Sequence, residues 1–181
     1  LNTSPACVES LSGYLMQARL GRPHVTLKLA TSLDGCIALA NGESQWITGP
    51  AARAHTHVMR AQADAILVGG ETLRADTPRL DVRLPGLADR SPERWVLTRG
   101  NAPDGWQALS SPDAITQMSH VQYLFVEGGA SAASAFLAAG LVDRLIIYRA
   151  PIIIGGGRTA ISDIGLSALA QAHDQWHLTE R

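Results

Sequence analysis

A carboxylate and two glycines separate two apolar segments in Tyr-Leu-Phe-Val-Glu-Gly-Gly-Ala-Ser, residues 123–131. The pattern predicts a strand that ends where a helix begins, a junction that lies at the carboxyl edge of a parallel sheet, where ligands collect. Glycines let a phosphate approach the backbone, and the start of a helix favours an anion. An ordinary turn would explain Gly128 and Gly129 alone, but Glu127 beside them favours a contact with ligand hydroxyls. The spacing is not Gly-x-Gly-x-x-Gly, so a standard Rossmann domain is not supported.

Lys28 is the only lysine of the chain, whereas fourteen of its fifteen basic residues are arginine. It lies in the alternating segment His-Val-Thr-Leu-Lys-Leu-Ala-Thr, residues 24–31, which predicts a strand with one polar-bearing face. A lysine within a strand is rare unless it is paired or faces a ligand. One interpretation is an edge lysine that reaches solvent, and the other is a point charge for a ligand oxygen or hydroxyl.

A third group of polar residues surrounds Gly-Glu-Ser-Gln-Trp-Ile-Thr-Gly, residues 42–49. Taken singly, each is typical of a solvated surface or a helix cap, and Trp46 alone is typical of a core. The group continues with Arg60, Thr72, Asp76, Arg79 and Arg83. His55 and His57 are two apart on a predicted helix, so they face different ways and predict no metal site. Ser32 and Asp34 could suggest a hydrolase triad, but Gly-x-Ser-x-Gly is absent.

The composition indicates one domain of 181 residues with enough apolar side chains, 46%, for a substantial core. The net charge is −1 and its signs are mixed, so we expect a small-molecule partner rather than nucleic acid or a membrane surface. Cys7 and Cys36 form no short motif, which favours a reducing cytoplasm. No apolar run approaches the roughly 20 residues of a membrane helix, so a soluble protein is expected.

Strands and helices are expected to alternate along the chain, which predicts an α/β fold with a mostly parallel central sheet flanked by helices. A weak helical pattern covers 1–21 as a connector segment, and the domain proper is expected at 22–181. Further expected strands are 65–69, 94–98, 122–126 and the apolar run 144–154, which Pro151 interrupts. Helices are expected at 50–63 and 131–139, and Gly140 is the stop signal of the second. The stretch 85–92 is expected to be a surface loop.

Several motifs occur together in one order: residues 22–35, 42–49, Met-Arg-Ala-Gln-Ala-Asp-Ala-Ile-Leu-Val-Gly at 59–69, Thr-Leu-Arg-Ala-Asp-Thr-Pro-Arg-Leu-Asp-Val-Arg at 72–83, Val-Glu-Gly-Gly at 126–129, Leu-Val-Asp-Arg-Leu at 141–145 and Ala-Pro at 150. In this order they resemble the reductase half of the bifunctional riboflavin-biosynthesis deaminase/reductase family, whose fold is similar to that of dihydrofolate reductase. The resemblance covers residues 13 to about 178.

The resemblance implies NADPH as hydride donor and 5-amino-6-(5-phosphoribosylamino)uracil as the substrate, reduced at ribose C1 to the ribitylamino product. The catalytic assignments it supports are Lys28 and Glu127, both near the ribose hydroxyls. The substrate side would comprise Ser44, Arg60, Leu80, Arg83 and Glu127. The cofactor side would comprise Ala30, Trp46, Thr72, Asp76, Thr98, Gly129, Ala130, Ser131, Ala132, Ala133, Ser134 and Ala135. The sequence singles out no proton donor.

Departures from the family leave several readings open. The zinc signature of the deaminase half, His-x-Glu with Cys-x-x-Cys, is absent, so deamination is not expected here. Residues 13–23 resemble the family's interdomain segment, which is compatible with a piece of a bifunctional enzyme or with a stand-alone relative. A homodimer is possible, as in the family. The competing functions are a reductase of a related pterin or pyrimidine and a non-catalytic nucleotide-binding domain.

Overall fold

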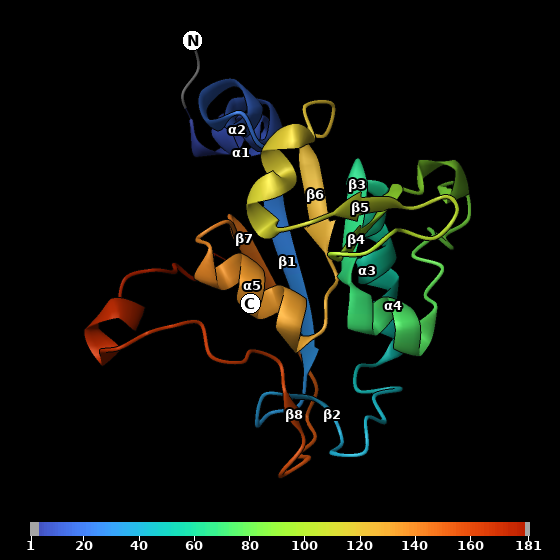
Figure 1. The fold of residues 1–181 in the computed structure, drawn as a ribbon, viewed down its shortest axis with the longest axis vertical. Helices are drawn as coiled ribbons and strands as arrows, with labels where there is room; N and C mark the ends of the chain where they lie inside the picture. The colour runs from blue at the N-terminus through green and yellow to red at the C-terminus, as the bar shows by residue number, and fades with distance from the viewer. Residues whose placement is uncertain (1–3, 180–181) are drawn as a thin grey trace.

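A six-stranded sheet forms the centre of the protein, with helices on both of its faces (Figure 1). The computed structural model describes residues 4–179. The sheet contains β1 (His24–Thr31), β3 (Ala65–Gly69), β4 (Glu93–Leu97), β5 (Gln107–Leu109), β6 (Tyr123–Val126) and β7 (Arg144–Arg149). Its order is β5-β4-β3-β6-β1-β7, and every neighbouring pair is parallel. The predicted α/β class and mainly parallel sheet are therefore confirmed.

The helices are α1 (Pro5–Ser10), α2 (Ser12–Leu20), α3 (Pro50–Ala61), α4 (Gly70–Asp76) and α5 (Ala130–Ala138), with 3₁₀ turns η1 (Ala88–Arg90), η2 (Pro112–Gln117) and η3 (Leu169–Ala172). Pro50 opens α3 because a proline at the first helical position gives up no helical hydrogen bond. Gly140 follows α5 with φ +65°, a left-handed conformation that glycine adopts without a Cβ clash.

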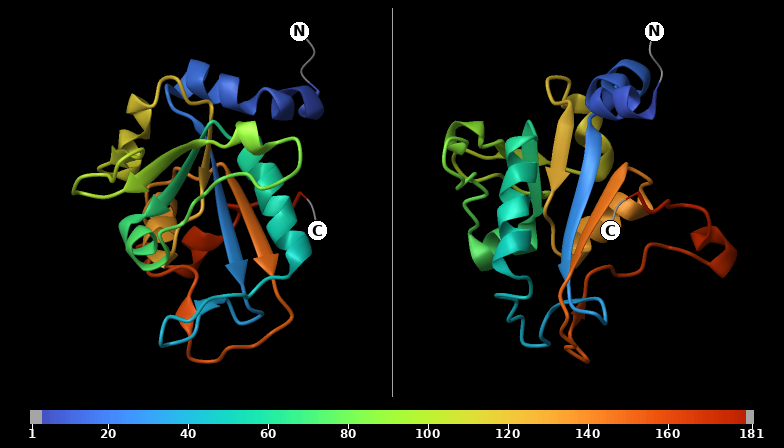
Figure 2. Two further views of the ribbon diagram at one scale, coloured as in Figure 1. Left: turned by 90° about the vertical axis from the view of Figure 1, so that its right-hand side faces the viewer. Right: turned by 180° about the vertical axis from the view of Figure 1, so that it is seen from behind.

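Each face of the sheet has its own apolar cluster. On one face, alternate residues of β1, among them Leu27, pack with Ile115 of η2 and Phe136 of α5. On the other face, Ile66 and Phe125 pack with Leu80 and with residues of α3 and α4. Figure 2 shows α3 and α5 on opposite sides of the strands. The helix that follows β3 thus lies on one face, and the helix that follows β6 lies on the other.

Smaller elements lie at the two ends of the strands. The helices α1 and α2 lie at the amino ends (Figure 1), where Gly13 is buried against the Tyr123 ring. A two-stranded antiparallel ribbon of β2 (Cys36–Ala38) and β8 (Arg158–Thr159) lies beyond the carboxyl ends. Beyond β8 the chain extends away from the sheet as an arm (Figures 1 and 2). No helix of the described chain has the length and apolar character needed to cross a membrane.

The strand and helix predictions agree with the structure to within one or two residues, with three exceptions. The connector pattern at 1–21 forms two helices within the described residues, separated at Leu11. The apolar run 144–154 is a strand only as far as Arg149, because the turn at Pro151 ends it. The sequence did not predict the four short elements β2, β5, β8 and α4, each of which has seven residues or fewer.

Candidate active site

A crevice lies at the carboxyl edge of the sheet, between the ends of β3 and β6. The strands β3 and β6 are neighbours but are far apart in sequence. Their following helices leave toward opposite faces, so the ends of these two strands are left uncovered between α4 and α5. Such a switch point is where open α/β sheets bind ligands.

A pocket of about 500 Å³ occupies this crevice. It is lined by the start of α4, the segment after β4, the turn before η2 and the start of α5. Its residues are Gly69, Gly70, Glu71, Thr72, Arg74, Leu97, Thr98, Arg99, Gly100, Ser110, Ser111, Pro112, Gly129, Ser131 and Ala132. The volume lies in the range of small-molecule and cofactor sites.

Close backbone packing holds the start of α5 beside α4. The Gly129 amide donates to Thr72 Oγ1 at 3.2 Å. A Cβ at Gly128 would lie 2.6 Å from the Ala132 Cβ, and one at Gly69 would lie 3.3 Å from the same atom. Because the Gly129 amide is already bonded, the amides available to an anion are those of the first turn of α5, residues 130–132.

A charged cluster adjoins the pocket on the α3 face of the sheet. The Arg60 guanidinium, from the last turn of α3, donates to both carboxylate oxygens of Glu127, from Nε at 2.6 Å and from Nη2 at 3.0 Å. Both side chains are about one-tenth exposed. The third nitrogen, Nη1, donates to the Asp81 carbonyl oxygen at 3.0 Å. Arg60 is thereby fixed between the end of β6 and the segment after α4.

Lys28 lies on this same face, and its Nζ is 5.8 Å from the centroid of the Tyr148 ring. β1 runs between β6 and β7, so Lys28 does not lie on an edge strand, contrary to that part of the solvent-facing interpretation. Burial lowers the pKa of Lys28; the Glu127 carboxylate opposes this effect and the Arg60 guanidinium adds to it. The ammonium is therefore held in a half-buried site within the electrostatic influence of an ion pair.

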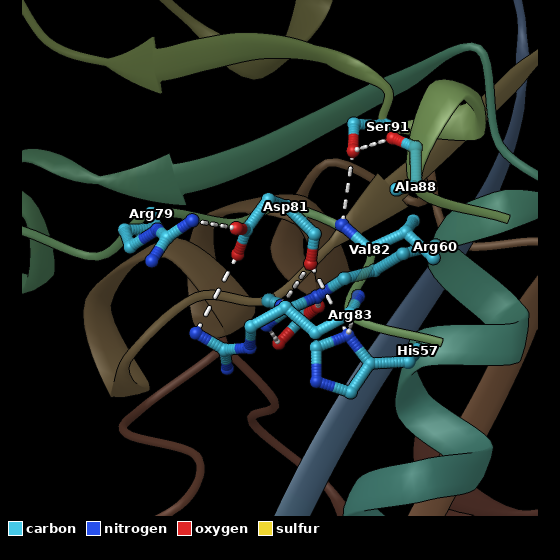
Figure 3. Close-up of polar contacts among 9 residues, drawn as sticks. His57, Arg60, Arg79, Asp81, Val82, Arg83, Ala88 and Ser91 are labelled. Carbon is cyan, nitrogen blue, oxygen red and sulfur yellow. Dashed lines mark hydrogen bonds and ion pairs between the residues drawn. The ribbon is translucent and has the colours of Figure 1, made fainter. Parts of the chain in front are cut away.

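Asp81 organises a second set of cations next to this cluster (Figure 3). Its carboxylate pairs with Arg79 at 2.6 Å and with Arg83 at 3.5 Å. Both arginine side chains are more than half exposed. His57 Nδ1 lies 3.1 Å from the Asp81 carbonyl oxygen. Desolvation lowers the pKa of His57, and the nearby Arg60 and Arg83 lower it further, as expected in a region of positive charge.

Tyr148 links the cluster to α3. Its hydroxyl lies 2.6 Å from His55 Nδ1, and burial raises the pKa of the phenol. His55 and His57 thus have different partners, as expected from their spacing on a helix. Ser32, considered above for a hydrolase triad, is fully buried, and its Oγ accepts a hydrogen bond from the Cys36 amide. It has a structural role in the turn before β2.

The predicted site residues fall into three groups in space. Lys28, Arg60, Leu80, Arg83 and Glu127 lie at the charged cluster or directly beside it, and Leu80 is itself buried with a left-handed backbone, φ +54°. Thr72, Thr98, Gly129, Ser131 and Ala132 line the pocket. The remaining residues lie elsewhere. Ala30 is on β1 and pairs with Tyr148 of β7. Ser44 and Trp46 are exposed on the loop before α3, Asp76 is exposed at the end of α4, and Ala130 and Ala133 to Ala135 belong to α5.

Two details differ from what the sequence suggested. Trp46 is 68% exposed and stacks on Arg53 at 4.7 Å, so it is not a core residue. Ser134 is buried, and its Oγ accepts a hydrogen bond from the Ser162 amide, so its side chain faces the chain after β8. The sequence reading omitted Arg74, Arg99, Ser110 and Ser111 from the pocket. The sequence held no motif that marks these residues, although Arg99 directly follows the expected strand 94–98.

Comparison with known proteins identifies relatives over most of the chain. The family model of the RibD C-terminal domain matches residues 23–180. The riboflavin biosynthesis protein RibD of Mycobacterium tuberculosis H37Rv is 40% identical over 176 residues, which cover 90% of this chain and 52% of that protein. RibD of Escherichia coli K12 is 34% identical, with coverages of 88% and 57%. The chain thus spans about half the length of the curated relatives it matches.

Solved structures show the same relationship. RibD of Acinetobacter baumannii is 30% identical, with a TM-score of 0.77, over 91% of this chain and 56% of that one. A diaminohydroxyphosphoribosylaminopyrimidine deaminase/5-amino-6-(5-phosphoribosylamino)uracil reductase from Thermotoga maritima is 26% identical, with a TM-score of 0.76, over 90% and 56%. These matches confirm the family expected from the sequence, and with it the dihydrofolate-reductase-like fold.

Proposed function

The chain belongs to the RibD C-terminal domain family, and from that premise we propose that it is the reductase that converts 5-amino-6-(5-phosphoribosylamino)uracil to its ribitylamino product. One observation carries the proposal. Glu127 of the charged cluster and Gly129 of the pocket are two residues apart on the loop after β6. A ligand in the pocket and a second ligand at the cluster would therefore be neighbours, as a hydride transfer requires.

We propose NADPH as the occupant of the pocket. Its volume, the three amides of the first turn of α5 and the glycines that bring α4 and α5 together suit a phosphorylated nucleotide. The residues that would hold it include Thr72, Thr98 and the α5 start, with Ala30, Trp46 and Asp76 nearer its other parts. When bound, NADPH supplies the hydride that reduces ribose C1.

The charged cluster would bind and orient the phosphorylated aminopyrimidine. Lys28 and Glu127 are assigned to ribose hydroxyls. An ammonium donates hydrogen bonds to hydroxyl oxygens, and a carboxylate accepts hydrogen bonds from hydroxyl groups of the same sugar. Arg60 and Arg83 are assigned to anionic or carbonyl groups of the substrate, with Ser44 and Leu80 completing this side. The half-buried position of Lys28 strengthens its field at the reacting carbon.

The test is to follow NADPH absorbance with the deaminated phosphoribosylamino pyrimidine and then with dihydrofolate. Turnover with the first substrate alone supports the proposal. Turnover with dihydrofolate would indicate a related pterin or pyrimidine reductase. Binding of NADPH without turnover of either would indicate a non-catalytic nucleotide-binding domain.

The organisation of the whole protein is part of the same proposal. Residues 1–21 are assigned to a connector and residues 22–181 to the reductase domain. Assembly as a homodimer and a cytoplasmic location, with neither nucleic acid nor membrane as partner, stay predictions.

A further inference from the structure

Reduction of a ribosyl group requires a proton as well as a hydride. When ribose C1 takes the hydride, the bond between C1 and the ring oxygen O4 breaks, and O4 keeps the electron pair of that bond. The O4 atom must then take a proton to become a hydroxyl of the open ribityl chain. Because an alkoxide is a poor leaving group, a side chain placed to donate this proton lowers the barrier.

Tyr148 lies near Lys28 on the face of the sheet that α3 covers. In the parallel register Tyr148 is the partner of Ala30, two residues beyond Lys28, so it lies nearer the carboxyl ends of the strands. Glu127 directly follows β6, the neighbour of β1 on its other side. Two strand spacings, roughly 10 Å, therefore separate the strands of Glu127 and Tyr148, and Lys28 is on the strand between them. A pentose above Lys28 would have the carboxylate on one side and the phenol on the other.

His55 holds the Tyr148 hydroxyl. The phenolic oxygen is 2.6 Å from His55 Nδ1, and the two rings meet edge to face, with 5.8 Å between their centroids and 80° between their planes. The Thr56 hydroxyl, from the next residue of α3, acts on the same oxygen and favours its anion. His55 is exposed, whereas Tyr148 is half-buried. The phenol is thus connected to solvent through the imidazole.

The direction of the His55–Tyr148 hydrogen bond decides what the phenol can do. If Nδ1 carries the imidazole proton, it donates to the phenolic oxygen, and the hydroxyl proton is free to point toward a ligand. The Nε2 atom is then the unprotonated nitrogen. Once the hydroxyl proton has left, the Nδ1–H group stabilises the phenolate, because a hydrogen bond to a charged group is roughly twice as strong as a neutral one.

Two other side chains near the charged cluster are poorer proton donors. Lys28 places its positive charge near the reacting carbon in the proposed function, and an ammonium that gave up its proton would lose that charge. His57 Nδ1 lies between the Asp81 carbonyl oxygen, at 3.1 Å, and the Arg83 amide, at 3.3 Å. Desolvation and the nearby Arg60 and Arg83 lower the pKa of His57, so this imidazole is held neutral.

We propose that Tyr148 donates the proton that ribose O4 takes, and that His55 positions the Tyr148 hydroxyl for this step. The Oη–H bond breaks, O4 receives the proton, and Oη keeps the electron pair as a phenolate, which then takes a proton from solvent. Burial raises the pKa of the phenol, so the hydroxyl is protonated at neutral pH, and a phenol is still a stronger acid than the alcohol that forms. The inference rests on the proposed function, in which ribose C1 accepts a hydride.

The rate of NADPH oxidation in a single turnover, with the protein saturated by both ligands, tests the donor. Tyr148→Phe keeps the ring and removes the hydroxyl. The matched control is Tyr14→Phe, which removes an exposed hydroxyl from α2 and should match the parent. We expect Tyr148→Phe to be about 100- to 10,000-fold slower, the usual contribution of a general acid. The dissociation constants of NADPH and of the pyrimidine should rise by less than about tenfold, as for the loss of one neutral hydrogen bond.

Two substitutions of His55 test its positioning role. His55→Asn keeps an N–H donor near the place of Nδ1, whereas His55→Ala removes it. In the single-turnover assay we expect His55→Ala to be about ten- to 150-fold slower, because it loses a charge-assisted hydrogen bond to the phenolate, and His55→Asn to recover most of that loss. Both variants should unfold at the temperature of the parent, since the side chain is exposed.

Nitrogen NMR of the protein with isotope-labelled histidine tests the geometry without cofactor or turnover. The His55 signals are assigned by their loss in His55→Ala. They should show the tautomer with the proton on Nδ1 in the parent. In Tyr148→Phe, where the phenolic oxygen is gone, they should shift toward the tautomer with the proton on Nε2, the commoner form of a free histidine side chain.

Two results would overturn this assignment alone. A saturated rate of Tyr148→Phe close to that of the parent, with or without weaker substrate binding, would show that the proton comes from elsewhere, while the proposed reductase would stand. A parent protein with the His55 proton on Nε2 would direct the hydroxyl proton of Tyr148 at Nδ1 rather than at the ligand. A parent that does not reduce the pyrimidine at all would overturn the proposed function together with this inference.

Discussion

The Arg60 guanidinium holds both carboxylate oxygens of Glu127, at 2.6 Å and 3.0 Å, and so joins the end of α3 to the end of β6. The pair is nearly buried. Its partners come from segments 67 residues apart, and each belongs to the proposed substrate side. The same contact therefore stabilises the fold and orients the carboxylate that is proposed to meet the ribose.

Replacing Arg60 by alanine should affect stability and catalysis together. Removing one partner of a buried pair costs about 3 to 5 kcal/mol, and the residual exposure places this pair toward the lower value. Chemical denaturation of Arg60→Ala, Glu127→Gln and the double variant forms a cycle. We expect a coupling free energy of about 1 to 3 kcal/mol. Additive effects of the two substitutions would show that the contact contributes nothing to stability. Arg19→Ala is the matched control for the loss of a charge.

Arg83 should act mainly on substrate binding. Its side chain is about half exposed and its ion pair with Asp81 is long, 3.5 Å, so it can turn toward a phosphate without breaking a buried contact. Arg83→Ala should lose about ten- to 150-fold in kcat/KM, chiefly through KM, as one charge-assisted bond is worth roughly 1.5 to 3 kcal/mol.

A substrate that lacks the 5-phosphate separates the roles of the two arginines. It should already be poor for the parent protein, and Arg83→Ala should then add little further loss. Arg60→Ala should still lose activity with this substrate, because the position of Glu127 changes. If each variant loses the same factor with and without the phosphate, neither arginine binds it.

Lys28 should control the alkaline limb of the pH profile. Because burial lowers its pKa below the usual 10.5, the ammonium should be lost at a lower pH than that of an exposed lysine, and kcat/KM should fall there. Lys28→Arg keeps the charge to higher pH, so that limb should move upward, although the larger guanidinium lowers the maximum rate. Lys28→Ala should lose far more activity than Arg19→Ala. Near-normal turnover of a folded Lys28→Ala protein would show that the ammonium has no part in the reaction.

The two glycines after β6 should respond differently to substitution. A Cβ on Gly128 would lie 2.6 Å from the Ala132 Cβ within α5, so Gly128→Ala should lower the free energy of unfolding by about 1 to 3 kcal/mol through overpacking. A Cβ on Gly129 would lie 3.1 Å from Thr72 Oγ1, beside the pocket, and its backbone conformation is open to any residue. Gly129→Val should therefore stay folded and lose NADPH binding. Thermal unfolding and NADPH titration of both variants decide this, and unchanged NADPH affinity in folded Gly129→Val contradicts it.

The long elements were predictable because their patterns are local. Alternation in β1 and Pro50 at the start of α3 are visible in the sequence, and the structure places both elements within one or two residues of expectation. The short strands β2, β5 and β8 are not, because two or three residues carry no period and depend on pairing with distant segments. The ribbon β2–β8 joins residues about 120 apart in the sequence.

The charged cluster was predictable only as a set of candidates. The sequence singled out Lys28, Arg60, Arg83 and Glu127, but the Arg60–Glu127 pair depends on how α3 packs on the sheet. Arg99 was missed because the segment after β4 has no motif of its own, and Arg74 because an exposed arginine on a short helix is an ordinary surface residue. Both became visible only as lining of one pocket.

The transfer of hydrogen from NADPH to ribose C1 is the central claim, and isotopic labelling measures it directly. The protein is incubated with the phosphoribosylamino pyrimidine and with NADPH deuterated at C4 of the nicotinamide, prepared separately in each of its two configurations. The account predicts a ribitylamino product with one deuterium on C1 of the ribityl chain from one configuration and none from the other. A ribitylamino product without deuterium from either configuration, or consumption of NADPH without any ribitylamino product, would contradict it.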